Sequence, residues 1–312
     1  MTISTRLTSA VTVFILVLTG HALAASSAGS DDSWQSGLLT WRADYEQELR
    51  APNGWLTLVG LEWLKPGENA FGSAADNLIV LKAPAAPHMG DVRLAGQTLD
   101  LLVPSGGFPK GLLVDGHTPA NPQNLQSDDS EHPSKLTLGT LTITVIHRGE
   151  RYALRIKDSQ ALVRTNFHGL KWYAPNATYR LQAKWIPYNP PRKTKIPTVL
   201  GTEVDSLAPG AVEFTLDGQT LRLEPMVESL NDKELFFVMS DATSKTATYG
   251  AGRFLDAELP SHGLLQPGEV WIDFNRAHNP PCAYTPYATC PLPPPQNRLK
   301  VAIPAGEQRF HD

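Results

Sequence analysis

Apolar and polar residues alternate in short runs along most of this chain, and turn residues separate the runs. In residues 140–145, Leu, Ile and Val alternate with Thr, and residues 152–157 repeat the pattern with Tyr, Leu and Ile. The polar segment His147-Arg148-Gly149-Glu150 lies between these two runs. Alternation of period two around a short glycine-containing segment predicts a β-hairpin.

Shorter runs of the same kind predict further strands. Asp217-Gly218 separates two of them and is typical of a two-residue hairpin turn. Prolines at 187, 190, 191 and 197 predict an extended linker or an edge strand, because proline has no backbone N–H to donate. The runs lie at residues 78–81, 91–94, 98–103, 179–185, 212–216, 220–223, 235–239, 270–274 and 299–303.

One segment near the N-terminus predicts a helix. Leu38, Trp41, Tyr45 and Leu49 recur at spacings of three and four, which places them on one face. Pro52-Asn53-Gly54 predicts its end. We expect this helix to cover a face or an edge of a sheet.

These elements predict an all-β protein of two sandwich- or barrel-like modules with one N-terminal amphipathic helix. Pro 26 and Gly 24 in a chain of 312 residues favour short strands and many turns. We expect four segments. They are a signal peptide at 1–24, a spacer and helix at 25–54, a first β module at 55–162 and a second β module at 163–312.

The leader predicts export to the periplasm or secretion. Arg6 precedes an apolar run from Val11 to Leu18, and Ala22-Leu23-Ala24 has the small-x-small pattern of a cleavage site. The run is shorter than the ~20 apolar residues of a spanning helix, so we expect no membrane span after cleavage. The formal net charge of -4 argues against nucleic acid as a partner.

The chain has two cysteines, Cys282 and Cys290. Export into an oxidising compartment favours a disulfide between them, and a loop this short would contribute about 2 kcal/mol. The alternative is a thiolate metal site, which the absence of a nearby C-x-x-C pair disfavours. We find no P-loop, no G-x-G-x-x-G, no H-E-x-x-H and no G-x-S-x-G, so we expect no cofactor and no metal.

The candidate site lies at the C-terminal end, where polar side chains, prolines and both cysteines are concentrated. In a strand Asp273 and Asn275 point to the same side, where they would present a carboxylate and an amide to a ligand. The alternative is that both bind the backbone of the following loop. Arg253 would bind an anion, or pair with Asp241 or Asp273 and tie two loops together. The predicted ligand-binding residues are Asp241, Arg253, Asp273, Asn275 and Asn279.

Four segments resemble a family of uncharacterised, largely exported bacterial proteins, domain of unknown function family 1684. They are GWLTLVGLEWLKPGENAFGS, FHGLKWYAP, TYGAGRFL and IDFNRAHNPPCAYTPYATCPLPPPQNRLKVAIPAGE. His278 departs from the family, in which we expect Tyr. The resemblance implies no reaction. More weakly, residues 64–81 resemble the start of a forkhead-associated domain, which implies a β-sandwich. Ser73 occupies the position of that domain's phosphate-binding Arg, so phosphopeptide binding is not implied.

Three functional hypotheses follow. The first is an exported module that binds a polar or anionic small molecule, such as a glycan fragment, in a pocket of the second module. The second is a hydrolase in which Asp273 or Glu307 acts as general base and Arg253 stabilises developing negative charge. The third is a structural module in which the C-terminal motif is a rigid brace without a ligand.

Overall fold

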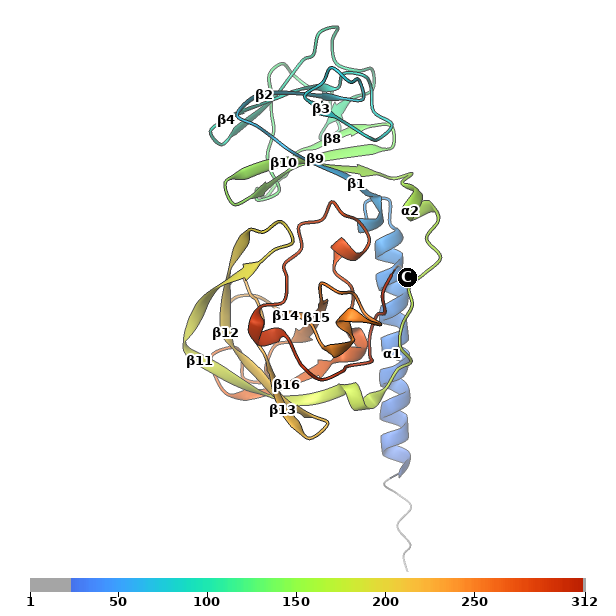
Figure 1. Ribbon diagram of the computed structural model, residues 1–312, viewed down its shortest axis with the longest axis vertical. Coiled ribbons are helices and arrows are strands. Elements are labelled where there is room, and N and C mark those ends of the chain that lie inside the picture. Colours follow the sequence, from blue (N-terminus) through green and yellow to red (C-terminus); the bar gives the residue numbers. More distant parts are fainter. Residues whose placement is uncertain (1–23, 311–312) are drawn as a thin grey trace, which may run out of the picture.

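The computed structural model describes the backbone of residues 24–310 and the side chains of residues 32–310. Two β-rich modules follow one another along the long axis of the molecule, with helix α1 (Ala24–Arg50) beside the second (Figure 1). The all-β prediction with a single N-terminal amphipathic helix is therefore confirmed. The predicted signal peptide lies outside the described residues.

The first module contains two five-stranded sheets. One has the order β1-β10-β9-β8-β6 and the other the order β3-β2-β4-β5-β7. The predicted hairpin is present, with Tyr152 opposite His147 and Ile156 opposite Ile143. The strands are β1 (Leu58–Trp63), β2 (Gly67–Gly72), β3 (Ile79–Val80), β4 (Gly90–Ala95), β5 (Thr98–Leu102), β6 (Leu113–Val114), β7 (Gln123–Asn124), β8 (Lys135–Leu138), β9 (Leu141–Arg148) and β10 (Arg151–Asp158).

Alternate residues of both sheets point into one apolar core. Phe71, Val92, Leu101, Ile143 and Leu154 are all buried in it. Because successive side chains of a strand face opposite sides, this burial explains the alternation in the sequence.

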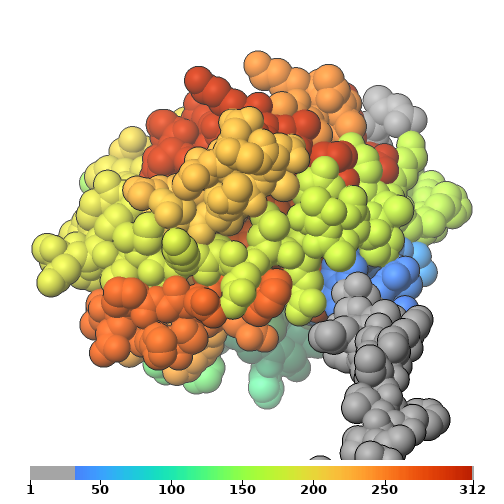
Figure 2. Space-filling view, turned by 90° about the horizontal axis from the view of Figure 1, so that it is seen from below, coloured from blue at the N-terminus to red at the C-terminus, as the bar shows by residue number. Residues whose placement is uncertain are grey.

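The second module contains a four-stranded sheet of order β13-β12-β11-β16 and a separate pair, β14-β15. A second core, which includes the fully buried Trp185, Phe237 and Phe274, lies between them. The strands are β11 (Arg180–Pro197), β12 (Glu203–Leu216), β13 (Gln219–Leu223), β14 (Glu234–Met239), β15 (Arg253–Glu258) and β16 (Gly268–Asp273). In the view of Figure 2, segments coloured yellow-green to red form most of the visible surface, and helix α1 (blue) lies at its side.

Helix α1 packs on the second module through the predicted apolar face. Leu38 and Leu49 are buried, and Trp41 stacks on Tyr45 with 5.6 Å between ring centroids. Arg42 donates to the carbonyl of Asn275, 3.0 Å away, which ties the helix to the C-terminal motif. A short helix, α2 (Leu162–Thr165), begins the connection from β10 to the second module.

Several expectations differ from the structure in detail. Residues 299–303 are not a strand, because they form only isolated backbone contacts with residues 240–242. Strand β15 was not predicted, since its inward-facing positions begin with the charged Arg253 instead of an apolar residue. The proline-containing part of β11 pairs with β12 alone, as an edge segment.

Candidate functional site

The predicted Arg253–Asp241 tie is present and fully buried. Arg253 Nη2 lies 2.7 Å from Asp241 Oδ2, and both side chains have no exposed surface. The guanidinium also donates to the carbonyls of Ala305 and Ile303. The second carboxylate oxygen of Asp241 accepts the backbone N–H and the hydroxyl of Thr243. The pair therefore joins the start of β15 to the segment after Met239 and to the C-terminal tail.

Asp273 and Asn275 bind protein groups, but only Asp273 binds the backbone of the following loop, as the alternative expected of both. Asp273 Oδ1 accepts the backbone N–H of Asn275, and Asp273 Oδ2 accepts the indole N–H of Trp34 at 2.7 Å. The amide of Asn275 binds both backbone groups of Asn176 at 2.9 Å. The same-side prediction does not apply, because β16 ends at Asp273 and Asn275 lies in a 3-10 turn, Phe274–Arg276.

Asn279 and Glu307 form a third buried group. The carboxylate of Glu307 accepts the backbone N–H of Asn279 at 2.8 Å and its side-chain amide at 2.6 Å. The hydroxyl of Tyr284 donates to the same carboxylate at 2.8 Å, and Tyr45 of α1 bonds to Tyr284. Within the described side chains, Asn279 Oδ1 is buried without a hydrogen-bond partner.

Burial shifts the pKa values of two groups in this region in opposite directions. Removal from water raises the pKa of Glu307 to about 7, although hydrogen bonds from Asn279 and Tyr284 oppose the shift. Burial also lowers the pKa of His278 to about 4, which keeps the imidazole neutral beside Tyr45. Glu307 should therefore change its protonation near neutral pH, and His278 should do so only in acid.

The five predicted ligand-binding residues thus belong to three internal groups. These groups pair Arg253 with Asp241, Asp273 with Asn275, and Asn279 with Glu307. Arg253, Asn275, Asn279 and Glu307 have no exposed surface, and apart from Arg253 Nε and Asn279 Oδ1 their polar side-chain atoms bond to protein atoms. Asp241 alone of this set lies beside a groove.

That groove has a volume of about 600 Å³ and opens on the second module. The segment 240–245 forms one wall, and residues 298–300 pair with it through backbone contacts of Ser240 and Ala242. Gly250 and Ala251 line the groove with little side-chain volume, and Leu292, Pro293 and Leu299 provide an apolar surface.

Three cationic side chains, Lys245, Arg298 and Lys300, line the groove. Arg298 is fixed by a bond from its Nε to the carbonyl of Pro293, 3.0 Å away. Among the described residues, both lysine ammonium groups are without an ion pair or a hydrogen bond. Asp241 is the one acidic residue in the lining, and its carboxylate is buried behind the surface, where it pairs with Arg253. The groove therefore has a net positive charge in an acidic protein.

These three cations were not among the predicted site residues. Lys245 lies in a 3-10 turn, Ala242–Lys245, whose start is capped by the Asp241 carboxylate. Arg298 and Lys300 alternate with Leu299 and Val301, a pattern that also fits an ordinary solvated strand face. Backbone pairing between distant segments places them in one groove, and such pairing leaves no local signal in the sequence.

Cys282 and Cys290 are adjacent free thiols in the structure, so the predicted disulfide is not formed in it. The backbone N–H of Cys282 donates to the Cys290 sulfur at 3.2 Å. The two residues are in contact, which is compatible with a disulfide, and the disulfide stays a prediction.

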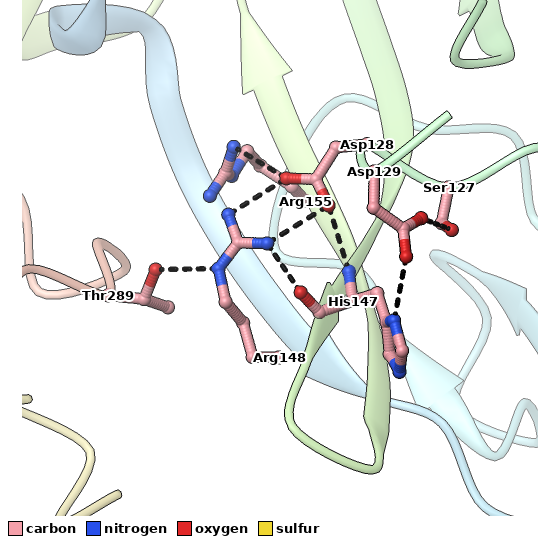
Figure 3. Close-up of polar contacts among 7 residues, drawn as sticks. All are labelled: Ser127, Asp128, Asp129, His147, Arg148, Arg155 and Thr289. Atoms are coloured by element: carbon pink, nitrogen blue, oxygen red, sulfur yellow. Dashed lines mark hydrogen bonds and ion pairs between the residues drawn. The ribbon is translucent and has the colours of Figure 1, made fainter. Parts of the chain in front are cut away.

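Ser127, Asp129 and His147 form a cluster in the first module (Figure 3). The Asp129 carboxylate accepts from the Ser127 hydroxyl and binds His147 Nδ1 at 2.9 Å. The serine is thus bound to the carboxylate, whereas an activated serine needs a bond to the imidazole. This geometry does not support nucleophilic catalysis.

The adjacent Asp128 interacts with two arginines. It accepts two bonds from Arg148, at 2.8 and 3.0 Å, and Arg155 lies 3.8 Å away (Figure 3). Arg148 also reaches Thr289 of the second module. This cluster therefore connects the two modules.

Two features are absent from the residues that the structure describes. No helix among them is long and apolar enough to cross a membrane. They also contain no group of three or more His, Cys, Asp or Glu side chains that would hold a metal ion.

The model of the family "Protein of unknown function (DUF1684)" matches residues 165–308, and this part of the chain belongs to the family. The chain is similar to an uncharacterized protein of Haloarcula marismortui known from a solution NMR structure. That likeness has 32% sequence identity, covers 46% of this chain and 78% of the other, and has a TM-score of 0.40. No curated protein matches this chain. The comparisons do not confirm the resemblance of the first module to forkhead-associated domains.

Proposed function

We propose that this protein binds a small anionic molecule in the groove lined by Lys245, Arg298 and Lys300. The observation that carries the proposal is the excess of positive charge there. Three cationic residues line the groove, and the one acidic residue in the lining, Asp241, has its carboxylate buried and paired with Arg253. The Coulomb energy of like charges in a concave site is relieved when an anion enters.

The size and lining of the groove support a small molecule as the ligand. Its volume of about 600 Å³ lies within the range typical of ligand pockets, about 300–1,000 Å³. Leu292, Pro293 and Leu299 would contact the carbon skeleton, while Arg298 would bind a carboxylate or phosphate with its two free terminal nitrogens. A carboxylated or phosphorylated sugar matches both requirements.

The buried network behind the groove supports this role by fixing the wall. Asp241 caps the turn that carries Lys245, and the same carboxylate accepts the backbone N–H of Ile303 at 3.1 Å. The wall that carries Lys245 is thus held before a ligand arrives. A site fixed in advance loses less conformational entropy on binding.

A hydrolytic role is less well supported by the geometry. A general base must reach the proton it removes, directly or through one water. Glu307 is fully buried under Asn279 and Tyr284, and Asp273 is bound by Trp34 and Asn275. We therefore assign no chemical step to either carboxylate.

The test is thermal unfolding in the presence of glucose phosphate, glucuronate and citrate, with glucose as the neutral comparison. A ligand at a hundred times its Kd stabilises the folded state by about 2.7 kcal/mol, so we expect at least one anion, and not glucose, to raise Tm. The double variant Lys245→Gln/Lys300→Gln should lose the response. The control, Lys184→Gln/Lys193→Gln, removes the same charge from exposed positions of β11 and should keep it. Equal responses in both variants would contradict the proposal.

We also propose export to the periplasm or beyond, on the strength of the leader pattern at residues 1–24. Fractionation of cells that produce the full chain tests this. The mature protein should begin after Ala24 and be found outside the cytoplasm. A protein that keeps Met1 and stays in the cytoplasm would contradict it.

A further inference from the structure

The segment from Cys282 to Cys290 lies between the two modules. Thr285 donates its hydroxyl to the carbonyl of Leu58 in β1, 3.0 Å away. Cys290 is buried in a small apolar cluster with Leu58 and Ala288. In Figure 1 this C-terminal region, in orange and red, extends toward the first module.

The two thiols have unequal surroundings. Cys290 is only 5% exposed, whereas Cys282 is partly exposed. The backbone N–H of Cys282 is directed at the Cys290 sulfur, so the two side chains lie against each other inside one short loop. The hydroxyl of Tyr249, on the segment that also lines the groove, donates to the carbonyl of Cys282 at 2.9 Å and holds this end of the loop.

We propose that Cys282 and Cys290 form a reactive dithiol that exchanges with small-molecule disulfides, with Cys282 as the attacking thiol and Cys290 as the resolving thiol. This goes beyond a permanent disulfide, because it gives the two sulfurs different chemical roles. It is also independent of the proposed anion groove.

The exchange would proceed in two balanced steps. The Cys282 thiolate attacks one sulfur of the disulfide RS–SR, the S–S bond breaks, and RS⁻ leaves and takes up a proton. The Cys290 thiol then loses its proton and attacks Cys282 Sγ, which releases the second RS⁻. Two protein thiols are oxidised to one disulfide, and RS–SR is reduced to two RSH.

The electrostatics agree with this order. The hydrogen bond from the Cys290 thiol is the main cause that lowers the pKa of Cys282, and burial opposes it. The same contact, together with burial, raises the pKa of Cys290. A thiolate is the nucleophile in exchange, so the more exposed and more acidic thiol reacts first.

The test is reaction of the reduced, folded protein with oxidised glutathione, followed by mass spectrometry. We expect the wild-type protein to lose two hydrogen atoms and retain no glutathione at the end point. Samples quenched early in acid should carry glutathione on the peptide of Cys282 and not on that of Cys290. The variant Cys290→Ser should retain one glutathione, whereas Cys282→Ser should retain none until it is unfolded.

Three results would overturn the proposal. One is early glutathione on Cys290 in the wild-type protein. Another is equal labelling of the two variants in the folded state, as judged by circular dichroism. The third is a wild-type protein that forms its disulfide only in denaturant. The wild-type mapping requires no variant to fold, so the proposal is tested even if a substitution disrupts the structure.

Discussion

Arg253 and Asp241 form an ion pair from which water is excluded, with 2.7 Å between Nη2 and Oδ2. The pair joins three segments that are distant in the sequence, and one of them forms a wall of the groove. The pair therefore holds the wall of the groove in place. The ligand would instead be bound by the cationic side chains that line the groove.

Removing the arginine from this pair should be strongly destabilising. Arg253→Met leaves the Asp241 charge buried without a partner, and we expect the free energy of unfolding to fall by about 3–5 kcal/mol. The double variant Arg253→Met/Asp241→Asn removes that charge and should recover part of the loss. Urea unfolding of both variants measures this. A single variant within about 1 kcal/mol of the wild-type protein would show that the pair contributes little.

Gly252 should not tolerate a side chain. Its φ is +102°, and an added Cβ would lie 2.5 Å from Pro293 Cγ and 2.6 Å from the Met239 carbonyl oxygen. We expect Gly252→Ala to lower stability by about 1–3 kcal/mol and to displace Pro293 in the groove lining.

Gly250→Ala is the matched control for this substitution. Its added Cβ meets nothing closer than the Ser244 carbonyl oxygen at 3.4 Å, and the backbone there is in an ordinary region. Thermal unfolding should therefore give a lower Tm for Gly252→Ala than for Gly250→Ala. Equal Tm values would contradict the steric argument.

Glu307 and His278 should give opposite pH dependences of stability. The pKa of Glu307 is raised to about 7, so its contribution is full below its unfolded value and is lost as pH rises through 7. The pKa of His278 is lowered to about 4, so its contribution is full above its unfolded value and is lost as pH falls toward 4.

The two effects overlap between about pH 4.5 and 6.5, where we expect them largely to cancel in the wild-type protein. Glu307→Gln should then leave stability that rises with pH, and His278→Gln should leave stability that falls with pH. Each slope is at most about 1.4 kcal/mol per pH unit, for one proton. Urea unfolding across this range measures both slopes. Two variants with slopes of the same sign would refute this account.

Much of the fold follows from periodicity in the sequence. The hairpin of β9 and β10 and the buried face of α1 were predicted because alternation and helical spacing record which side of an element is buried. The same reasoning wrongly predicted a strand at residues 299–303. Leu299, Val301 and Ile303 do alternate, but the segment makes only isolated backbone contacts with Ser240 and Ala242, beyond the end of β14.

The candidate site was less predictable for a physical reason. Polar residues in a rigid C-terminal segment suggest a ligand site, yet Asp273, Asn275 and Asn279 satisfy backbone and side-chain groups of distant segments. Such partners are set by the tertiary fold. The Arg253–Asp241 pair was among the alternatives, whereas the joint position of Lys245 with Arg298 and Lys300 depends on long-range backbone pairing.

The most direct test of the central claim is an NMR titration of the isotopically labelled protein with the anion that raises Tm most. The account predicts that backbone amides of residues 240–245 and 298–300 shift in a saturable manner, and that amides around Asp273 and Asn275 stay unchanged. Shifts centred on Asp273 and Asn275, with the groove amides unchanged, would contradict it.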